Sequence, residues 1–190
     1  MRFDEIQRKP TLYLDMDGVL ADFFGEWARS HGVEHYKQID KKDIKASLDR
    51  VGEDAESFFE NLPVLSGAQE LLRAAQAYGG YTILSSPLER KEEESIQGKR
   101  RWIDRHLGAY PPEHVIFERN KARYAVTNGV ANILIDDYGV NIAAWEAAGG
   151  RAFKHRSRSF QDSIDWLKGI QDEVESIKPS GAGSSSKRPL

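Results

Sequence analysis

The chain has 190 residues, and its 27 basic and 30 acidic side chains give a formal net charge of −3 at pH 7. This length predicts a single domain with room for a small insert, and the nearly balanced charge gives no overall attraction to nucleic acid or to a membrane surface. The absence of cysteine excludes disulfides, thiolate metal sites and a cysteine nucleophile.

No apolar segment reaches the ~20 residues that cross a bilayer, and residues 1–10 are polar, unlike the apolar part of a secretory leader. We therefore expect a cytoplasmic protein with no membrane partner and no stable binding to nucleic acid. The sequence does not specify an oligomeric state, and a dimer is compatible with it.

Five short apolar segments are typical of strands, the last of them less clearly than the others. They cover residues 11–15, 81–85, 115–118, 132–136 and 151–154. Between the strands, helical patterns cover residues 66–78, 89–107 and 140–148, and the first of them begins with a capping-box sequence at Ser66. Strands that alternate with helices predict an α/β fold with a parallel sheet.

Residues 22–63 break this alternation, because their apolar residues follow helical spacing and no convincing strand pattern occurs among them. We expect a small helical cap at 22–63, inserted after the first strand into a core domain formed by residues 1–21 and 64–178. Residues 179–190 are rich in serine and glycine, which predicts a disordered tail.

Two carboxylates follow the first predicted strand, in the sequence Asp15-Met16-Asp17-Gly18. Side chains at positions i and i+2 project to the same side of an extended chain. Two carboxylates that face one point repel each other unless a cation or a shared proton lies between them. The pair therefore indicates a chemical site, although an Asp-x-Asp-Gly sequence on its own is also a common turn.

Three later predicted strands are also followed by polar side chains, and each has a structural alternative as a helix cap or a solvated surface group. These side chains are Ser85 and Ser86, Lys121, and the second acidic pair Asp136-Asp137. Ligands of open parallel sheets bind beyond the carboxyl ends of the strands. The four strand ends together therefore predict one Mg²⁺-phosphate site.

The four motifs together resemble those of the haloacid dehalogenase-like (HAD) hydrolases, a family of aspartyl-phosphate phosphohydrolases. Residues 15–19 are similar to the first motif of that family, and Ser85, Lys121 and the acidic pair 136–137 match its second, third and fourth motifs in order. Residues 15–23, 62–68 and 85–88 resemble more closely the 5'(3')-deoxyribonucleotidase branch. The resemblance implies a Rossmann-like three-layer α/β/α core with a small helical cap after the first strand.

The resemblance implies that Asp15 is the nucleophile and that Asp17 is a general acid and then a general base. It also implies a Mg²⁺ ion held by the carboxylates of Asp15 and Asp137 and by the backbone carbonyl of Asp17. Asp136 would support these ligands, and the roles of Asp136 and Asp137 could be reversed.

Substrate contacts are implied at several further residues. Ser85 and Lys121 would hold the phosphoryl oxygens, and Ser86 would touch phosphate or sugar. Phe23 and other aromatic residues of the cap would stack on a base or, alternatively, pack in the core of the cap. The basic residues 99–101 are expected on a solvated helix face, with contact to substrate as the alternative.

The resemblance implies a Mg²⁺-dependent phosphohydrolase that removes phosphate from (deoxy)ribonucleoside monophosphates. Two alternatives stay open at this point. One is a phosphatase of another small phosphorylated metabolite or of a polynucleotide 3'-phosphate, and the other is a non-catalytic phosphate-binding regulatory protein. The sequence specifies neither the base nor the sugar position.

Overall fold

The computed structural model describes residues 9–176, so the tail predicted at 179–190 lies outside the described residues. Five parallel strands form the main sheet in the order β3-β2-β1-β6-β7. They are β1 (Leu12–Leu14), β2 (Thr82–Ser85), β3 (His114–Phe117), β6 (Ile133–Asp136) and β7 (Arg151–Lys154). All five predicted strands are confirmed.

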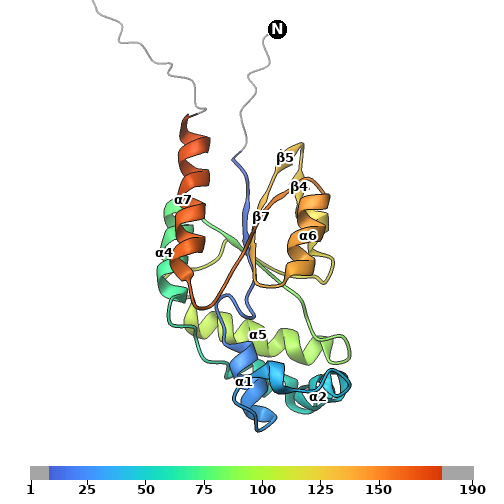
Figure 1. Cartoon of the computed structure of the whole chain (residues 1–190). Coiled ribbons are helices and arrows are strands. Elements are labelled where there is room, and N and C mark those ends of the chain that lie inside the picture. The colour runs from blue at the N-terminus through green and yellow to red at the C-terminus, as the bar shows by residue number, and fades with distance from the viewer. Residues whose placement is uncertain (1–8, 177–190) are drawn as a thin grey trace, which may run out of the picture.

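Helices cover both faces of the sheet (Figure 1). Helices α4 (Ala68–Tyr78) and α7 (Phe160–Ser176) pack together on one face, and α6 (Gly139–Ala147) lies on the other. The predicted three-layer α/β/α architecture is confirmed, and α7 is an addition that has no counterpart among the predicted helices. None of the described helices has the length and apolar character that crossing a membrane requires.

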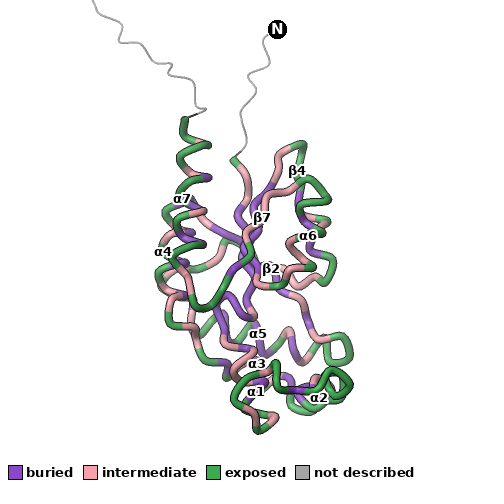
Figure 2. Tube along the Cα trace, in the orientation of Figure 1, coloured by how far each residue is buried: buried purple, intermediate pink, exposed green. Residues whose placement is uncertain are grey.

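The two faces of the sheet bury separate sets of apolar side chains. Leu12 and Leu14 of β1 belong to the larger cluster, which includes residues of α4 and α7, whereas Tyr13 belongs to a smaller cluster with Trp145 of α6. This alternation follows from the two-residue period of a strand. Buried residues run along the strands and the inner sides of the helices (Figure 2), so the ends of the strands are held by a packed core.

A helical insert follows β1 and lies beyond the carboxyl end of the sheet (Figure 1). It contains α1 (Phe23–Ser30), η1 (Tyr36–Gln38), α2 (Ile44–Val51), η2 (Gly52–Asp54) and α3 (Ala55–Glu60). The chain segments that lead into and out of it are paired, because Asp22 N donates to Pro63 O at 2.8 Å and Leu65 N donates to Leu20 O at 2.9 Å. These helices occupy the interval of the predicted cap.

Helix α5 (Glu92–His106) connects the core to the insert. It packs closely on α3 at Gly98, where a Cβ atom would overlap the backbone carbonyl of Glu56. The indole Nε1 of Trp102 donates to Leu62 O at 2.7 Å, and Trp102 is fully buried. One face of α5 is therefore fixed against the cap helices.

Two local details differ from the sequence-based expectations. The capping box predicted at Ser66 is wrong, because α4 begins two residues later with Gly67 as its N-cap and no side chain caps it. A short hairpin formed by β4 (Val126–Thr127) and β5 (Val130–Ala131) was not predicted, since strands of two residues carry no measurable periodicity. The predicted end of α4 at Gly79 is confirmed, with φ at +117°.

Candidate active site

The first acidic pair lies where β1 ends and a tight turn begins. Asp15 N still donates to Ile135 O of β6 at 3.0 Å, so Asp15 is held as an extension of the sheet. Gly18 then adopts φ +76°, and a Cβ atom there would lie 2.6 Å from Oδ2 of Asp137. Glycine is required at this turn both by its backbone conformation and by the closeness of the Asp137 carboxylate.

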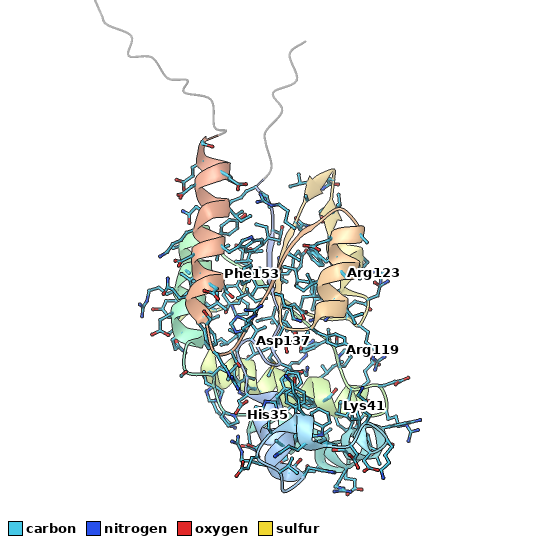
Figure 3. The ribbon with its side chains drawn as sticks, in the orientation of Figure 1. His35, Lys41, Arg119, Arg123, Asp137 and Phe153 are labelled. Atoms are coloured by element: carbon cyan, nitrogen blue, oxygen red, sulfur yellow. The ribbon has the colours of Figure 1, made fainter. Side chains whose placement is uncertain are left out.

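Three carboxylates form a cluster at the ends of β1 and β6. Oxygens of Asp15, Asp136 and Asp137 lie within 4.8 Å of one another, and Asp137 lies at the end of the sheet that faces the cap (Figure 3). Burial, followed by the charges of Asp15 and Asp136, raises the pKa of Asp137 to about 8. Such a set of oxygen donors fits a hard divalent cation, which would relieve the repulsion between the carboxylates.

Lys121 lies between two of these carboxylates. It begins η3 (Lys121–Tyr124), and its Nζ lies 2.8 Å from Oδ1 of Asp15 and 2.6 Å from Oδ2 of Asp136. Burial lowers the pKa of Lys121, but the charges of Asp15 and Asp136 outweigh this effect and the net shift is upward. The lysine is therefore charged although it is only 2% exposed.

The two aspartates at the end of β6 have different surroundings. Asp136 accepts hydrogen bonds on both oxygens, from Lys121 Nζ and Asn141 Nδ2 on Oδ2 and from Tyr138 N on Oδ1. Within residues 9–176, no donor is hydrogen-bonded to the carboxylate of Asp137. Asp136 is thus occupied by protein donors, and Asp137 is the member of the pair with oxygens available to a ligand.

Lys99 of α5 is a site residue that the sequence interpretation missed. Its side chain is fully buried, and Nζ donates to Oδ2 of Asp17 at 2.6 Å, to Oγ of Ser85 at 2.8 Å and to the carbonyl of Ser86 at 2.8 Å. The expectation of a solvated face for residues 99–101 is therefore wrong for Lys99, whereas Arg100 is exposed as expected.

A signal for Lys99 was present in the sequence. Lys99 lies four residues after Ser95 and three before Trp102, and all three are buried on one face of α5. Counting the helical register from Trp102, a large apolar residue of a type that is usually buried, would have placed Lys99 on the same face.

Asp17 occupies a partly buried position beside Asp15. Burial raises the pKa of Asp17, the charge of Lys99 opposes this shift, and the charge of Asp15 adds to it, with an upward net result. Oδ1 of Asp17 is buried and has no hydrogen-bond partner among the described residues. These surroundings favour a carboxyl group that holds and releases a proton.

The remaining predicted contacts are distributed between the two sides of the site. Ser85 is fully buried at the end of β2, and Ser86 is half-buried with its Oγ 3.4 Å from the carbonyl of Glu118. Phe23 is 9% exposed and stacks on Phe59 of α3 at a centroid distance of 5.9 Å. It therefore lies in the aromatic core of the cap, and its contact with a substrate stays a prediction.

A cavity of about 780 Å³ opens beside the carboxylate cluster. Gly18 and Asp137 line it on the core side, and Phe24, His35 and Tyr36 line it on the side of the cap. Figure 3 shows Asp137 and His35 on the two sides of this region. The volume lies in the range of small-molecule sites, about 300–1,000 Å³.

The parallel sheet, the helical insert after β1 and the acidic strand ends are the arrangement of a haloacid dehalogenase-like fold. A solved HAD family hydrolase from Deinococcus radiodurans R1, described as holding phosphate and sodium, shares the fold at a TM-score of 0.50. It is 18% identical, and the alignment covers 83% of this chain and 87% of that chain.

Sequence comparison identifies the family within this class. The family model described as "5' nucleotidase, deoxy (Pyrimidine), cytosolic type C protein" matches residues 9–163. Proteins of Bordetella bronchiseptica and Bordetella pertussis, each named "Putative 5'(3')-deoxyribonucleotidase", are 30% identical over 174 aligned positions, and the alignment covers 82% of this chain and 90% of each relative. The chain belongs to this family and is a phosphoric monoester hydrolase of the 5'-nucleotidase type.

Proposed function

We propose that the protein removes phosphate from nucleoside monophosphates in a Mg²⁺-dependent reaction that passes through an aspartyl-phosphate on Asp15. The position of Asp15 is the observation that carries this proposal. Its Oδ1 accepts from Lys121 Nζ and from Met16 N, whereas Oδ2 accepts no hydrogen bond from any residue within 9–176. The carboxylate is thus oriented by one oxygen and can attack with the other.

In the first step, Oδ2 of Asp15 attacks phosphorus and the bond between phosphorus and the nucleoside oxygen breaks. The carboxyl group of Asp17 gives its proton to the departing alkoxide. In the second step, the Asp17 carboxylate takes a proton from water, and the resulting hydroxide attacks phosphorus. The bond between phosphorus and Asp15 breaks, which releases inorganic phosphate and restores both carboxyl groups.

The residues that would hold Mg²⁺ are the carboxylates of Asp15 and Asp137 and the backbone carbonyl of Asp17. Asp136 would support them through Lys121, since its own oxygens are already hydrogen-bonded. When bound, the metal ion supplies positive charge that polarises the phosphoryl group and offsets the charge of the carboxylates.

Substrate binding is proposed for residues of both the core and the cap. The hydroxyls of Ser85 and Ser86 and the ammonium of Lys121 would hold the phosphoryl oxygens, and Phe23 would support the base from the cap. We retain the division into a core domain of 1–21 and 64–178 and a cap of 22–63, which the paired connecting segments support. A cytoplasmic location agrees with the family's description as a cytosolic type.

Release of inorganic phosphate from a panel of substrates tests this function. The panel contains ribo- and deoxyribonucleoside monophosphates and sugar phosphates, each assayed with Mg²⁺ and with excess EDTA. We expect the highest kcat/KM values for nucleoside monophosphates, and loss of turnover in EDTA. Equal kcat/KM values for sugar phosphates and nucleotides would contradict the nucleotide assignment, and undiminished turnover in EDTA would contradict the metal requirement.

A further inference from the structure

Part of the cavity lining is basic. It presents four exposed cationic side chains, Lys37, Lys154, Arg156 and Arg158. Lys37 belongs to η1 of the cap, and the other three come from the end of β7 and the loop that follows it. Within the described part of the chain, none of the four forms an ion pair. Positive charge therefore faces the cavity from both the cap and the core.

The loop that carries three of these cations begins next to the carboxylate cluster. Lys154 pairs in register with Asp136 on β6, and its Nζ would lie 3.3 Å from a Cβ atom on Gly139. Lys154 and the two loop arginines line the same cavity as Asp137 of the cluster.

Hydrogen bonds fix the shape of this loop. His155 N donates to the carbonyl of Asp136 at 2.8 Å, and Nδ1 of His155 lies 2.8 Å from Oγ of Ser163 at the start of α7. Ser159 N donates to the carbonyl of Arg156 at 2.8 Å, which closes a turn over the exposed arginines. Because this backbone is already ordered, binding an anion there requires little further ordering.

Acidic side chains of the cavity do not neutralise this basic wall. Asp137 belongs to the carboxylate cluster, and Asp22 caps α1 through Gly25 N and lies 3.6 Å from Arg29. Glu34 is the third acidic residue of the lining and is exposed. The four cations of the lining outnumber its three acidic residues, two of which are already engaged elsewhere, so this part of the cavity carries net positive charge.

We propose that the preferred substrate carries a second phosphate group, remote from the phosphate that is removed, and is therefore a nucleoside 3',5'-bisphosphate. This inference rests on the proposed function and names its substrate class. One phosphate would lie at Asp15, and the sugar would direct the other toward Arg156 and Arg158. Guanidinium groups bind phosphate through paired, charge-assisted hydrogen bonds. A nucleoside monophosphate has no second phosphate to accept these hydrogen bonds from the loop arginines.

The test compares thymidine 3',5'-bisphosphate with thymidine 5'-monophosphate as substrates of the full chain in Mg²⁺. We expect the wild type to prefer the bisphosphate by about tenfold in kcat/KM, equivalent to about 1.4 kcal/mol, mainly through a lower KM. In the double variant Arg156→Gln/Arg158→Gln, this ratio falls to about one. The matched control is Arg151→Gln, which removes an arginine paired with Glu173 at the opposite end of β7 and keeps the ratio of the wild type.

A wild-type ratio of one or less, or an unchanged ratio in the double variant, would overturn the inference. Turnover of the monophosphate without any preference would leave the proposed function standing and refute the second phosphate site alone. If neither nucleotide is hydrolysed, the proposed function fails, and calorimetric binding still decides the inference. In that case, the bisphosphate must bind the wild type about tenfold more tightly than it binds the double variant.

Discussion

Two buried lysines hold the carboxylates of the first motif in different ways. Lys121 binds Asp15 together with Asp136, and Lys99 binds Asp17 together with Ser85. A buried charge is tolerated only when it is paired and hydrogen-bonded, so each lysine depends on its carboxylate partners. Separate cations thus orient the proposed nucleophile and the proposed proton carrier.

Replacement of Lys99 tests its role as a positioning residue. Lys99→Met removes the donor to Oδ2 of Asp17 and the charge that lowers the pKa of Asp17. We expect kcat/KM to fall about 100-fold or more. The basic limb of the pH–rate profile should move to higher pH, because Asp17 must hold its proton to protonate the departing alkoxide and its pKa rises when the charge of Lys99 is removed.

The measurement is kcat/KM from pH 5 to pH 9 for Lys99→Met beside Arg100→Met, which alters an exposed neighbour on the same helix. We expect the control to keep the profile of the wild type. A reduced rate with an unshifted basic limb would show that Lys99 acts on stability or substrate binding rather than through Asp17.

His155 predicts a pH dependence of stability. Burial lowers the pKa of His155 from 6.5 to about 4. Between these two values the unfolded chain binds a proton that the folded protein does not, so the free energy of unfolding falls as the pH falls. The free energy of unfolding falls by up to about 1.4 kcal/mol for each pH unit between 6.5 and about 4. Above pH 6.5, His155 is neutral in both states and adds no pH dependence.

Urea unfolding at pH 6.5 and pH 5 measures this effect as the difference between the wild type and His155→Gln. We expect the wild type to lose more stability than the variant over this interval. His114→Gln replaces an exposed histidine and is the control for the loss of any histidine, as opposed to the loss of the buried one. Parallel losses in the wild type and His155→Gln would contradict the prediction.

At the scale of elements, strands were more predictable than helix faces. The strands could be predicted because each is a continuous apolar segment that ends in polar residues. Asp15 and Asp136 stand at two of these ends, and their place in the sheet therefore predicted them as site residues. The position of α5 could not be predicted in the same way. Its contact with the cap at Gly98 joins residues about forty positions apart in the chain, and this long-range contact decides which of its polar residues are buried.

The contact between α5 and α3 predicts opposite effects for two glycine substitutions. Gly98→Ala places a Cβ atom against the carbonyl of Glu56, so we expect it to destabilise the protein by about 1–3 kcal/mol, although alanine favours a helix. Gly169→Ala lies in the interior of α7 with no atom within 4 Å of the new Cβ, and it should stabilise by about 0.5–1 kcal/mol.

Urea unfolding of the two variants measures both changes, and each serves as the control for the other. Stabilisation by Gly98→Ala would contradict the close packing of α5 on the cap. Because Lys99 follows Gly98 directly, we also expect this variant to lose activity, whereas Gly169→Ala should keep it.

At the scale of the whole molecule, the carboxylate cluster opposes folding when no metal ion is bound. Burial and neighbouring charges raise the pKa of Asp137 from 3.8 to about 8. Because this pKa is raised in the folded state, the contribution of Asp137 to the free energy of unfolding is most favourable below pH 3.8 and becomes less favourable as the pH rises toward 8, by up to about 1.4 kcal/mol per pH unit. Asp137→Asn removes this effect.

Thermal unfolding with EDTA and with Mg²⁺ tests this electrostatic account. In EDTA at pH 7.5, we expect Asp137→Asn to unfold at a higher temperature than the wild type. Mg²⁺ should raise the unfolding temperature of the wild type, because the ion binds only the folded state, and should have little effect on the variant. Equal Mg²⁺ shifts in the two proteins would exclude Asp137 as a ligand.

The central claim is that Asp15 performs the chemistry, and phosphate release by Asp15→Asn tests it most directly. The assay uses saturating deoxyribonucleoside monophosphate and Mg²⁺, with Asp104→Asn, an exposed aspartate of α5, as the matched control. We predict that Asp15→Asn lowers kcat by at least about 10⁴-fold and that the control keeps the rate of the wild type. A kcat for Asp15→Asn within tenfold of the wild type would contradict nucleophilic catalysis by Asp15.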